Sequence, residues 1–169
     1  MHCKDYFYKL LVILIIRMVH AHIEKRIILS GCLIINEKKE ILLLYRSDHN
    51  HYETPGGKVR LRECSNPENP SNEDLAKTAE RELYEELGEN IKIKKLKYFG
   101  KVEFEIPGGK LAVANKFLTS IISGNPILNE PDEFSKFDYL PIEHLEKYPI
   151  SPDLKLILPR LKKYFEEKK

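Results

Sequence analysis

Residues 81–88 place three glutamates where a helix gains no stability from them. The run reads Arg-Glu-Leu-Tyr-Glu-Glu-Leu-Gly and ends at Gly88, a residue type that often terminates helices. Glu82, Glu85 and Glu86 stand at i, i+3 and i+4, so they share an arc of roughly 100° on one helix face. Such like charges repel by about 0.2–0.5 kcal/mol per pair, and the helix dipole disfavours each by about 0.3–1 kcal/mol. Because a hard divalent cation would reverse both penalties, the run predicts a metal-binding helix end.

The residues around this run extend it into a longer pattern. Pro55-Gly56-Gly57 lies upstream, and Glu73 precedes Arg81 by seven intervening residues. The pattern resembles the Nudix box, Gly-x5-Glu-x7-Arg-Glu-U-x-Glu-Glu-x-Gly-U, in which U is a bulky aliphatic residue. The positions of the helical half that match in register are Glu73, Arg81, Glu82, Leu83, Glu85, Glu86 and Gly88.

The chain departs from this pattern in two places. Fifteen residues separate Gly57 from Glu73 instead of five, which indicates a ten-residue insertion. Glu63 stands at the expected distance from Gly57, so either Glu63 or Glu73 fills the first acidic position. The last position holds Glu89 instead of an aliphatic residue, and Ile91 is a candidate to replace it in the core.

Composition is that of an ordinary globular protein. A chain of 169 residues with 42% hydrophobic and 32% charged residues is sufficient for one domain with a substantial core. A net charge of +2 does not favour a nucleic-acid partner. The cysteines, Cys3, Cys32 and Cys64, lack metal-ligand spacing, and we expect reduced thiols in a cytoplasmic protein.

The N-terminus contains an apolar run at 10–16 whose role the sequence leaves open. Seven residues are far fewer than the roughly 20 that a membrane-spanning helix needs. The run is therefore an ordered extra strand or helix, an extension ahead of a true start at Met18, or a targeting segment. We expect residues 1–17 to lie outside the core and residues 18–169 to form the domain, with no membrane association.

Strand and helix patterns alternate along the rest of the chain. Strands are predicted at 26–35, 40–46, 58–61, 92–105, 111–122 and 134–140, separated by a polar loop at 47–54, a tight turn at 55–57 and the inserted loop at 62–70. A helix is predicted from Ser71 or Asn72 to Leu87, with Asp74 completing a capping box and Ala76, Ala79, Leu83 and Leu87 as its buried stripe. A second helix begins at 151–153 and continues, with a kink, through Pro159.

This alternation predicts an α/β protein in which helices cover a sheet. The resemblance implies the same class in more detail, an α/β/α sandwich with a mixed, partly curled β-sheet. It also implies that Glu82, Glu85 and Glu86 bind a metal ion together with the carbonyl of Gly57. Carboxylates without His or Cys suit Mg²⁺, with Mn²⁺ also possible, better than Zn²⁺.

Further site residues follow from position in the sequence. Arg81 lies four residues before Glu85 and can pair with it on the helix. The resemblance implies a general base that is either a box glutamate or a loop glutamate, and here the loop candidates are Glu130 and Glu133. Alternatively, the helix glutamates form a solvated face paired with nearby lysines.

Three residues near the glycine-rich segment are candidates for substrate binding. Arg46 and Lys58 could each contact a phosphate or simply end a strand in solvent. Tyr52 could stack on a base or pack beside a turn. His49 and His51 are expected in a surface loop.

The resemblance implies a Mg²⁺-dependent hydrolase that cleaves a nucleoside diphosphate linked to another group and releases a nucleoside monophosphate. Both an ADP-ribose-like compound and a nucleoside triphosphate fit this class, and by the resemblance the position of Pro107 points towards ADP-ribose. The alternative is a nucleotide-sensing module that keeps the fold without hydrolysis, because the insertion could displace the Gly57 carbonyl. A third possibility, RNA binding, would need a basic groove. A homodimer is possible.

Overall fold

The computed structural model describes Val12 and residues 26–167, so the apolar run at 10–16, apart from Val12, and the expected domain start at 18 lie outside the described residues. The strands are β1 (Arg26–Ile34), β2 (Glu40–Arg46), β3 (His51–Glu53), β4 (Gly56–Lys58), β5 (Lys92–Ile93), β6 (Lys97–Ile106), β7 (Lys110–Thr119), β8 (Ile121–Ser123) and β9 (Phe134–Pro141). The helices are α2 (Asn72–Leu87), α3 (Pro152–Glu166) and the 3₁₀ turns η1 (Leu61–Glu63) and η2 (Ile142–Lys147). Within the described chain, no helix has the length and apolar character needed to cross a membrane.

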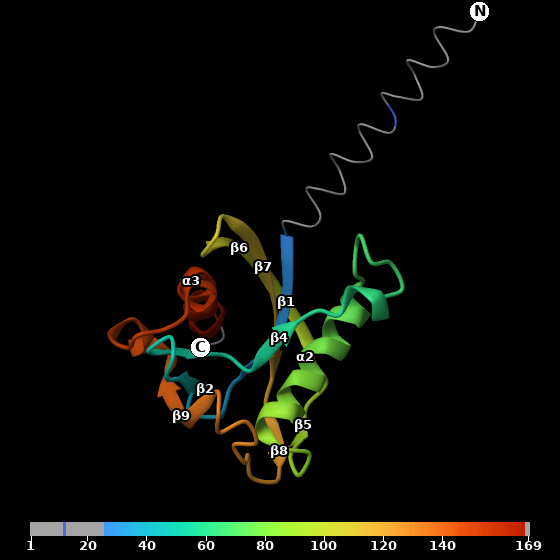
Figure 1. The fold of residues 1–169 in the computed structure, drawn as a ribbon. Coiled ribbons are helices and arrows are strands. Elements are labelled where there is room, and N and C mark those ends of the chain that lie inside the picture. The colour runs from blue at the N-terminus through green and yellow to red at the C-terminus, as the bar shows by residue number, and fades with distance from the viewer. Residues whose placement is uncertain (1–11, 13–25, 168–169) are drawn as a thin grey trace, which may run out of the picture.

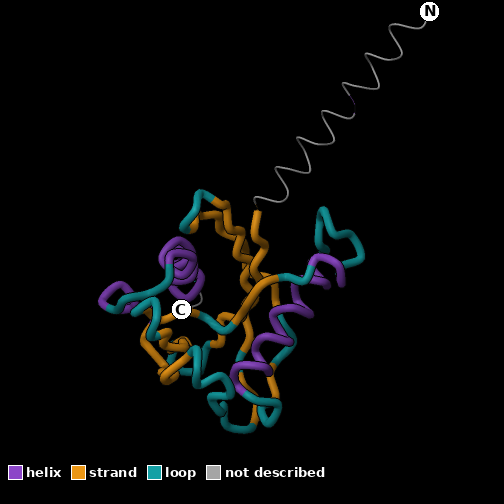
Figure 2. Tube along the Cα trace, in the orientation of Figure 1, coloured by secondary structure: helices purple, strands orange, loops and turns teal. Residues whose placement is uncertain are grey.

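The strands form a mixed four-stranded sheet and two smaller antiparallel sheets. The larger sheet has the order β4-β1-β7-β6, with β1 parallel to β7 and the other neighbours antiparallel. The smaller sheets have the orders β3-β2-β9 and β5-β8. Helices α2 and α3 lie on opposite sides of the larger sheet, as Figure 1 and Figure 2 show. The predicted α/β class with a mixed sheet is confirmed.

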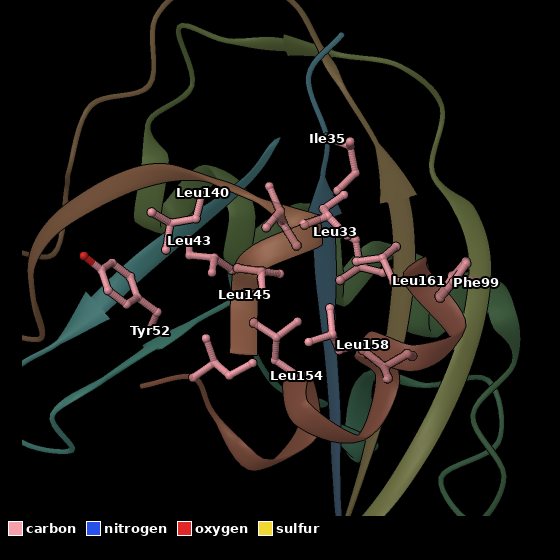
Figure 3. Close-up of a cluster of buried hydrophobic side chains, with 14 of the residues drawn as sticks. Leu33, Ile35, Leu43, Tyr52, Phe99, Leu140, Leu145, Leu154, Leu158 and Leu161 are labelled. Carbon is pink, nitrogen blue, oxygen red and sulfur yellow. The ribbon is translucent and has the colours of Figure 1, made fainter. Parts of the chain in front are cut away.

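Two hydrophobic cores lie on the two faces of the sheets, and strand alternation divides the side chains between them. Cys32 and Ile34 of β1 face the core beneath α2, whereas Leu33 and the following Ile35 face the core beneath α3. Figure 3 shows the second of these cores, with leucines of α3 packed against the strands. Full burial stabilises each such aliphatic side chain by about 1.5–3 kcal/mol.

Helix α2 begins and ends at the residues that the sequence predicts. The Ser71 hydroxyl accepts a hydrogen bond from the Asp74 N–H, and the Asp74 carboxylate accepts one from the Ser71 N–H, which completes the capping box. The helix ends at Gly88, whose φ of 86° favours glycine. Its buried stripe includes Leu83 and Leu87, so the acidic face lies beside the apolar one.

Local predictions were wrong in four segments whose structure depends on strand pairing. Residues 51–53 form strand β3 instead of loop, because Arg46 pairs with His51 across the turn. Residues 56–58 form strand β4 against β1 instead of a tight turn followed by a strand at 58–61. The strands predicted at 92–105 and 111–122 are each divided, into β5 with β6 and β7 with β8. Helix α3 does continue through Pro159.

Candidate active site

Strand β4 and helix α2 meet at the two glycines of the Pro-Gly-Gly segment. The Gly56 N–H donates a hydrogen bond to Glu86 Oε2 at 3.1 Å. A Cβ atom on Gly57 would overlap the carboxylate of Glu82. The backbone of β4 therefore lies directly against two of the three helix glutamates, and the insertion before α2 does not separate them. Figure 2 shows that insertion as a loop beside the first turn of α2.

Arg81 holds two of the glutamates in place. Its Nη1 donates to Glu85 Oε2 at 2.5 Å, and its Nη2 donates to Glu82 Oε1 at 2.5 Å. The predicted pairing with Glu85 is confirmed, and the contact with Glu82 is additional. One arginine thus fixes the rotamers of two carboxylates that would otherwise repel each other.

Glu86 is the most deeply placed of the three, at 3% exposure. Burial, followed by the negative charge of Glu82, raises the pKa of Glu86 well above its usual value. Glu130 and Glu53 raise this pKa further, and the hydrogen bond from Gly56 opposes the rise. Among the described residues Arg81 pairs with Glu82 and Glu85, and no cationic side chain pairs with Glu86. Such a set of carboxylate oxygens fits a hard divalent cation.

The loop between β8 and β9 brings a further glutamate to this cluster. The Ile127 N–H donates to the Leu87 carbonyl and the Asn129 N–H donates to the Glu86 carbonyl, both at 2.9 Å. These bonds join the loop to the C-terminal carbonyls of α2. Burial and then the charge of Glu133, followed by the charges of Glu82 and Glu85, raise the pKa of Glu130.

The two loop glutamates therefore have different surroundings. Glu130 is half-buried and feels the charges of the helix carboxylates. Glu133 instead pairs with Arg46, with its Oε2 3.2 Å from Arg46 Nη1. Arg46 also contacts Asp48 at 3.0 Å and Glu53 at 3.4 Å, so its guanidinium joins β2 to three carboxylates.

The other two residues predicted to bind substrate have different placements. Tyr52 is buried, with its ring edge-on to those of Tyr45 and Tyr148 and its hydroxyl donating to Asp138 at 2.7 Å. Figure 3 shows it within the core beneath α3, which corresponds to the packing alternative and not to base stacking. Lys58 is exposed at the end of β4.

A cleft of about 560 Å³ is bounded on one side by Gly56 and Gly57, the two glycines that contact Glu86 and Glu82. Arg46, Glu53 and the histidines of the β2–β3 turn line another part. Its apolar wall comes from β6 and the turn after it, at Phe104, Ile106 and Pro107.

A buried ion pair lines the same cleft. Lys116 Nζ of β7 lies 2.6 Å from Asp153 Oδ2 of α3 and donates to Thr54 Oγ1 at 2.5 Å. Burial opposes ionisation of Asp153, but Lys116 outweighs it and lowers the pKa of that carboxyl. The nearby Ser151 hydroxyl contributes to this lowering, yet it is buried and makes no hydrogen bond of ordinary geometry to the described residues.

Sequence reasoning missed Glu53, Lys116 and Asp153. A lysine within the run at 112–118, which is apolar apart from this lysine and Asn115, was the available signal, because a central strand position rarely accepts an unpaired charge. Its partner, Asp153, lies 37 positions further along the chain at the start of α3. The sequence therefore gives no local sign that the two residues pair.

Comparisons with known proteins agree with this geometry. The family model described as the NUDIX domain matches residues 25–161. The chain is similar to the crystal structure of a MutT protein from Methanosarcina mazei Go1, with a TM-score of 0.64, 27% identity and coverage of 85% of this chain and 96% of that one. A comparison with curated proteins gives no match.

Two further structures share the fold at lower identity. A MutT NUDIX hydrolase from Burkholderia pseudomallei has a TM-score of 0.64 and 24% identity, covering 79% of this chain and 96% of that one. A C. elegans Ap4A hydrolase, solved as a binary complex, has a TM-score of 0.60 and 22% identity, covering 85% and 99%. The family model matches most of the chain, and Glu82 and Glu86 lie against the glycines of β4. The chain belongs to the NUDIX domain family and is a Nudix-type pyrophosphohydrolase.

Proposed function

We propose that the protein hydrolyses a phosphoanhydride bond in a nucleoside diphosphate linked to another group, using Mg²⁺ and releasing a nucleoside monophosphate. The observation that carries the proposal is the contact of Glu82 and Glu86 with the glycines of β4. Glu86 is nearly inaccessible to water, yet no cationic side chain pairs with it among the described residues. A bound cation would supply the missing charge.

The proposed ligands are the carboxylates of Glu82, Glu85 and Glu86 together with the carbonyl of Gly57. They offer only oxygen, which favours Mg²⁺ and also permits Mn²⁺. When bound, such an ion orients the phosphates, offsets charge on their oxygens and acidifies a coordinated water. Arg81 positions two of these carboxylates through its paired hydrogen bonds.

We assign the general base to Glu130. A base must carry no proton when the attacking water is deprotonated, and a raised pKa makes it a better acceptor near neutral pH. Glu130 has this shift and lies on a loop joined to the end of α2. Glu133 is less suited, because its carboxylate is engaged by Arg46.

The cleft accommodates the remainder of the substrate in this proposal. Its apolar wall at Phe104, Ile106 and Pro107 offers a surface for a planar base or a sugar. Ser151 adds a buried hydroxyl that a polar group of the substrate could satisfy. Arg46 lines the cleft and is the proposed contact for a phosphate.

The contacts between β4 and α2 do not support the non-hydrolytic alternative. It depended on the insertion displacing Gly57, but Gly56 and Gly57 lie against Glu86 and Glu82. We further propose that the domain starts after residue 17, since the family match begins at residue 25. Cytoplasmic location is supported by the free thiols of Cys32 and Cys64.

A product assay distinguishes the substrate classes. Purified protein with Mg²⁺ would be given ADP-ribose, nucleotide sugars, nucleoside triphosphates and dinucleoside tetraphosphates, and the products separated by chromatography. We expect a nucleoside monophosphate from at least one compound and none when Mg²⁺ is withheld. Tight binding of a nucleotide without any product would support the sensing alternative instead.

A further inference from the structure

Three potential metal ligands line the cleft, in the turn after β2 and along β3. His51 and Glu53 occupy alternate positions of β3 and so point to the same side, and His49 lies in the turn that precedes this strand. Among the described residues, their ligand atoms all lie within 4.8 Å of one another. His51 Nε2 is 3.2 Å from Glu53 Oε2, and the two imidazole rings are 5.3 Å apart. All three side chains line the cleft.

Arg46 orients the carboxylates around this group. Its Nε donates to Asp48 Oδ1 at 3.0 Å, and its Nη1 donates to Glu53 Oε1 at 3.4 Å. The second oxygen of each carboxylate is directed to an imidazole, with Glu53 Oε2 near His51 and Asp48 Oδ2 3.7 Å from His49 Nε2. Arg46, which holds Glu53, and Asp48, which faces His49, would be the outer groups, and such groups are characteristic of protein metal sites.

We propose that His49, His51 and Glu53 bind a divalent transition metal ion of the Zn²⁺ class, at a site separate from the glutamates of α2. Two imidazole nitrogens and one carboxylate oxygen form a donor set that selects Zn²⁺, Co²⁺ or Ni²⁺ over Mg²⁺. Three protein ligands leave a coordination position for water or for an oxygen of a molecule in the cleft. The proposal does not depend on the proposed substrate.

The geometry requires only a small adjustment. Ligand distances of about 2.0–2.2 Å around Zn²⁺ place neighbouring donor atoms roughly 3.3 Å apart. The pair formed by His51 and Glu53 already meets that spacing at 3.2 Å. His49 has a side chain that is 54% exposed, so its imidazole can rotate towards the other two ligands without disturbing the core.

The test uses the full chain, stripped of metal and kept in excess Mg²⁺ so that the carboxylates of α2 are occupied. Because His2 and Cys3 could bind the same ions, all variants carry His2→Ala and Cys3→Ser. Zn²⁺ binding is measured by calorimetry, and Co²⁺ serves as a spectroscopic probe of coordination. We expect one ion per chain and a tetrahedral Co²⁺ spectrum without thiolate charge transfer, since no cysteine belongs to the site.

Matched variants locate the site. His49→Ala and His51→Ala should each weaken Zn²⁺ binding about tenfold or more, and Arg46→Gln should weaken it through loss of orientation. His144→Ala, an exposed histidine on η2, should bind as the parent does. His49 is exposed, so its variant should keep the parent circular dichroism spectrum. Unchanged Zn²⁺ affinity in the folded His49→Ala, His51→Ala double variant, or an octahedral Co²⁺ spectrum, would overturn the proposal.

Discussion

Gly57 lies so close to Glu82 that any side chain at position 57 would occupy the space of the carboxylate. The obstructing atoms are the far end of a flexible glutamate side chain and not backbone, so Gly57→Ala can be accommodated by moving Glu82. At Gly56 the obstructing atoms are the backbone of Ser30 and Gly31, and the φ of 155° is unfavourable for other residues. Both glycines contact the site, but a side chain would displace a glutamate at position 57 and sheet backbone at position 56.

We predict that Gly57→Ala folds normally but loses about a hundredfold in Mg²⁺-dependent turnover, because the displaced Glu82 no longer binds the ion. Gly56→Ala should instead lower the free energy of unfolding by about 1–3 kcal/mol. Thermal unfolding and turnover, measured on both variants, check this division. Equal turnover of Gly57→Ala and wild type would remove Glu82 from the ligand set.

Glu86→Gln should have opposite effects on stability and activity. Burial and the charge of Glu82 raise the pKa of Glu86 in the folded state above its unfolded value. The Glu86 carboxyl therefore favours folding fully only below its unfolded pKa, and this stability is lost as pH rises through the folded pKa. Removing the charge should therefore stabilise the metal-free protein by about 1–3 kcal/mol at pH 8, and the gain should shrink as pH falls towards about 4.

The same variant should lose about a hundredfold or more in turnover and should no longer be stabilised by Mg²⁺. Denaturant unfolding with and without Mg²⁺ gives both quantities. Glu85→Gln should lose activity similarly but should not gain stability, because the variant loses the charge that pairs with Arg81. A Glu86→Gln protein that is less stable than wild type without metal would contradict the account of its burial.

Glu130→Gln and Glu133→Gln form a matched pair that tests the general base. We expect Glu130→Gln to reduce kcat by about 10²–10⁴-fold, the usual contribution of a general base, and Glu133→Gln to reduce it much less. In the wild type, turnover should fall as pH decreases through the raised pKa of Glu130, because the protonated carboxyl accepts no proton. An acidic limb that persists in active Glu130→Gln protein would assign the base elsewhere.

Asp153→Asn should leave Lys116 buried without its partner and cost about 3–5 kcal/mol of stability at neutral pH. The folded pKa of Asp153 lies below the unfolded value, so this difference is complete above about pH 4 and is lost as pH falls through the folded pKa. Chemical denaturation at several pH values measures it.

Replacing both partners, as in Lys116→Met with Asp153→Asn, should recover much of that loss, since no unpaired charge remains in the protein interior. If the double variant is as unstable as the single one, the cost comes from Asp153 contacts other than the ion pair. Its hydrogen bonds at the start of α3 would then be the cause.

Local chemistry in the sequence was sufficient to predict α2 and the acidic face that it carries. The capping box at Ser71, the terminal Gly88 and the spacing of Glu82, Glu85 and Glu86 all act within a few residues of one another. The pairing of Arg81 with Glu85 follows from the helix repeat alone. These features depend little on the remainder of the fold.

Features that depend on distant partners could not be predicted in the same way. Gly56 and Gly57 resemble a turn locally, and only pairing with β1 makes them a strand. Tyr52 stands next to polar residues, yet its backbone bonds to Pro149 and Ser151 and its ring packs in the core beneath α3. The ion pair of Lys116 with Asp153 requires the packing of α3 against the sheet.

The carboxyl end of α2 contains no basic residue in its last turn, where many helices carry a lysine or arginine. Peptide N–H groups of Ile127 and Asn129 neutralise the negative pole in their place. A backbone N–H carries no full charge and, unlike a lysine or arginine side chain, cannot form an ion pair with a nearby glutamate. The loop before β9 thereby stabilises the end of α2 without adding a positive side chain that would compete with the metal ion for the glutamates. Shortening this loop would lower both the stability of the protein and its affinity for the ion.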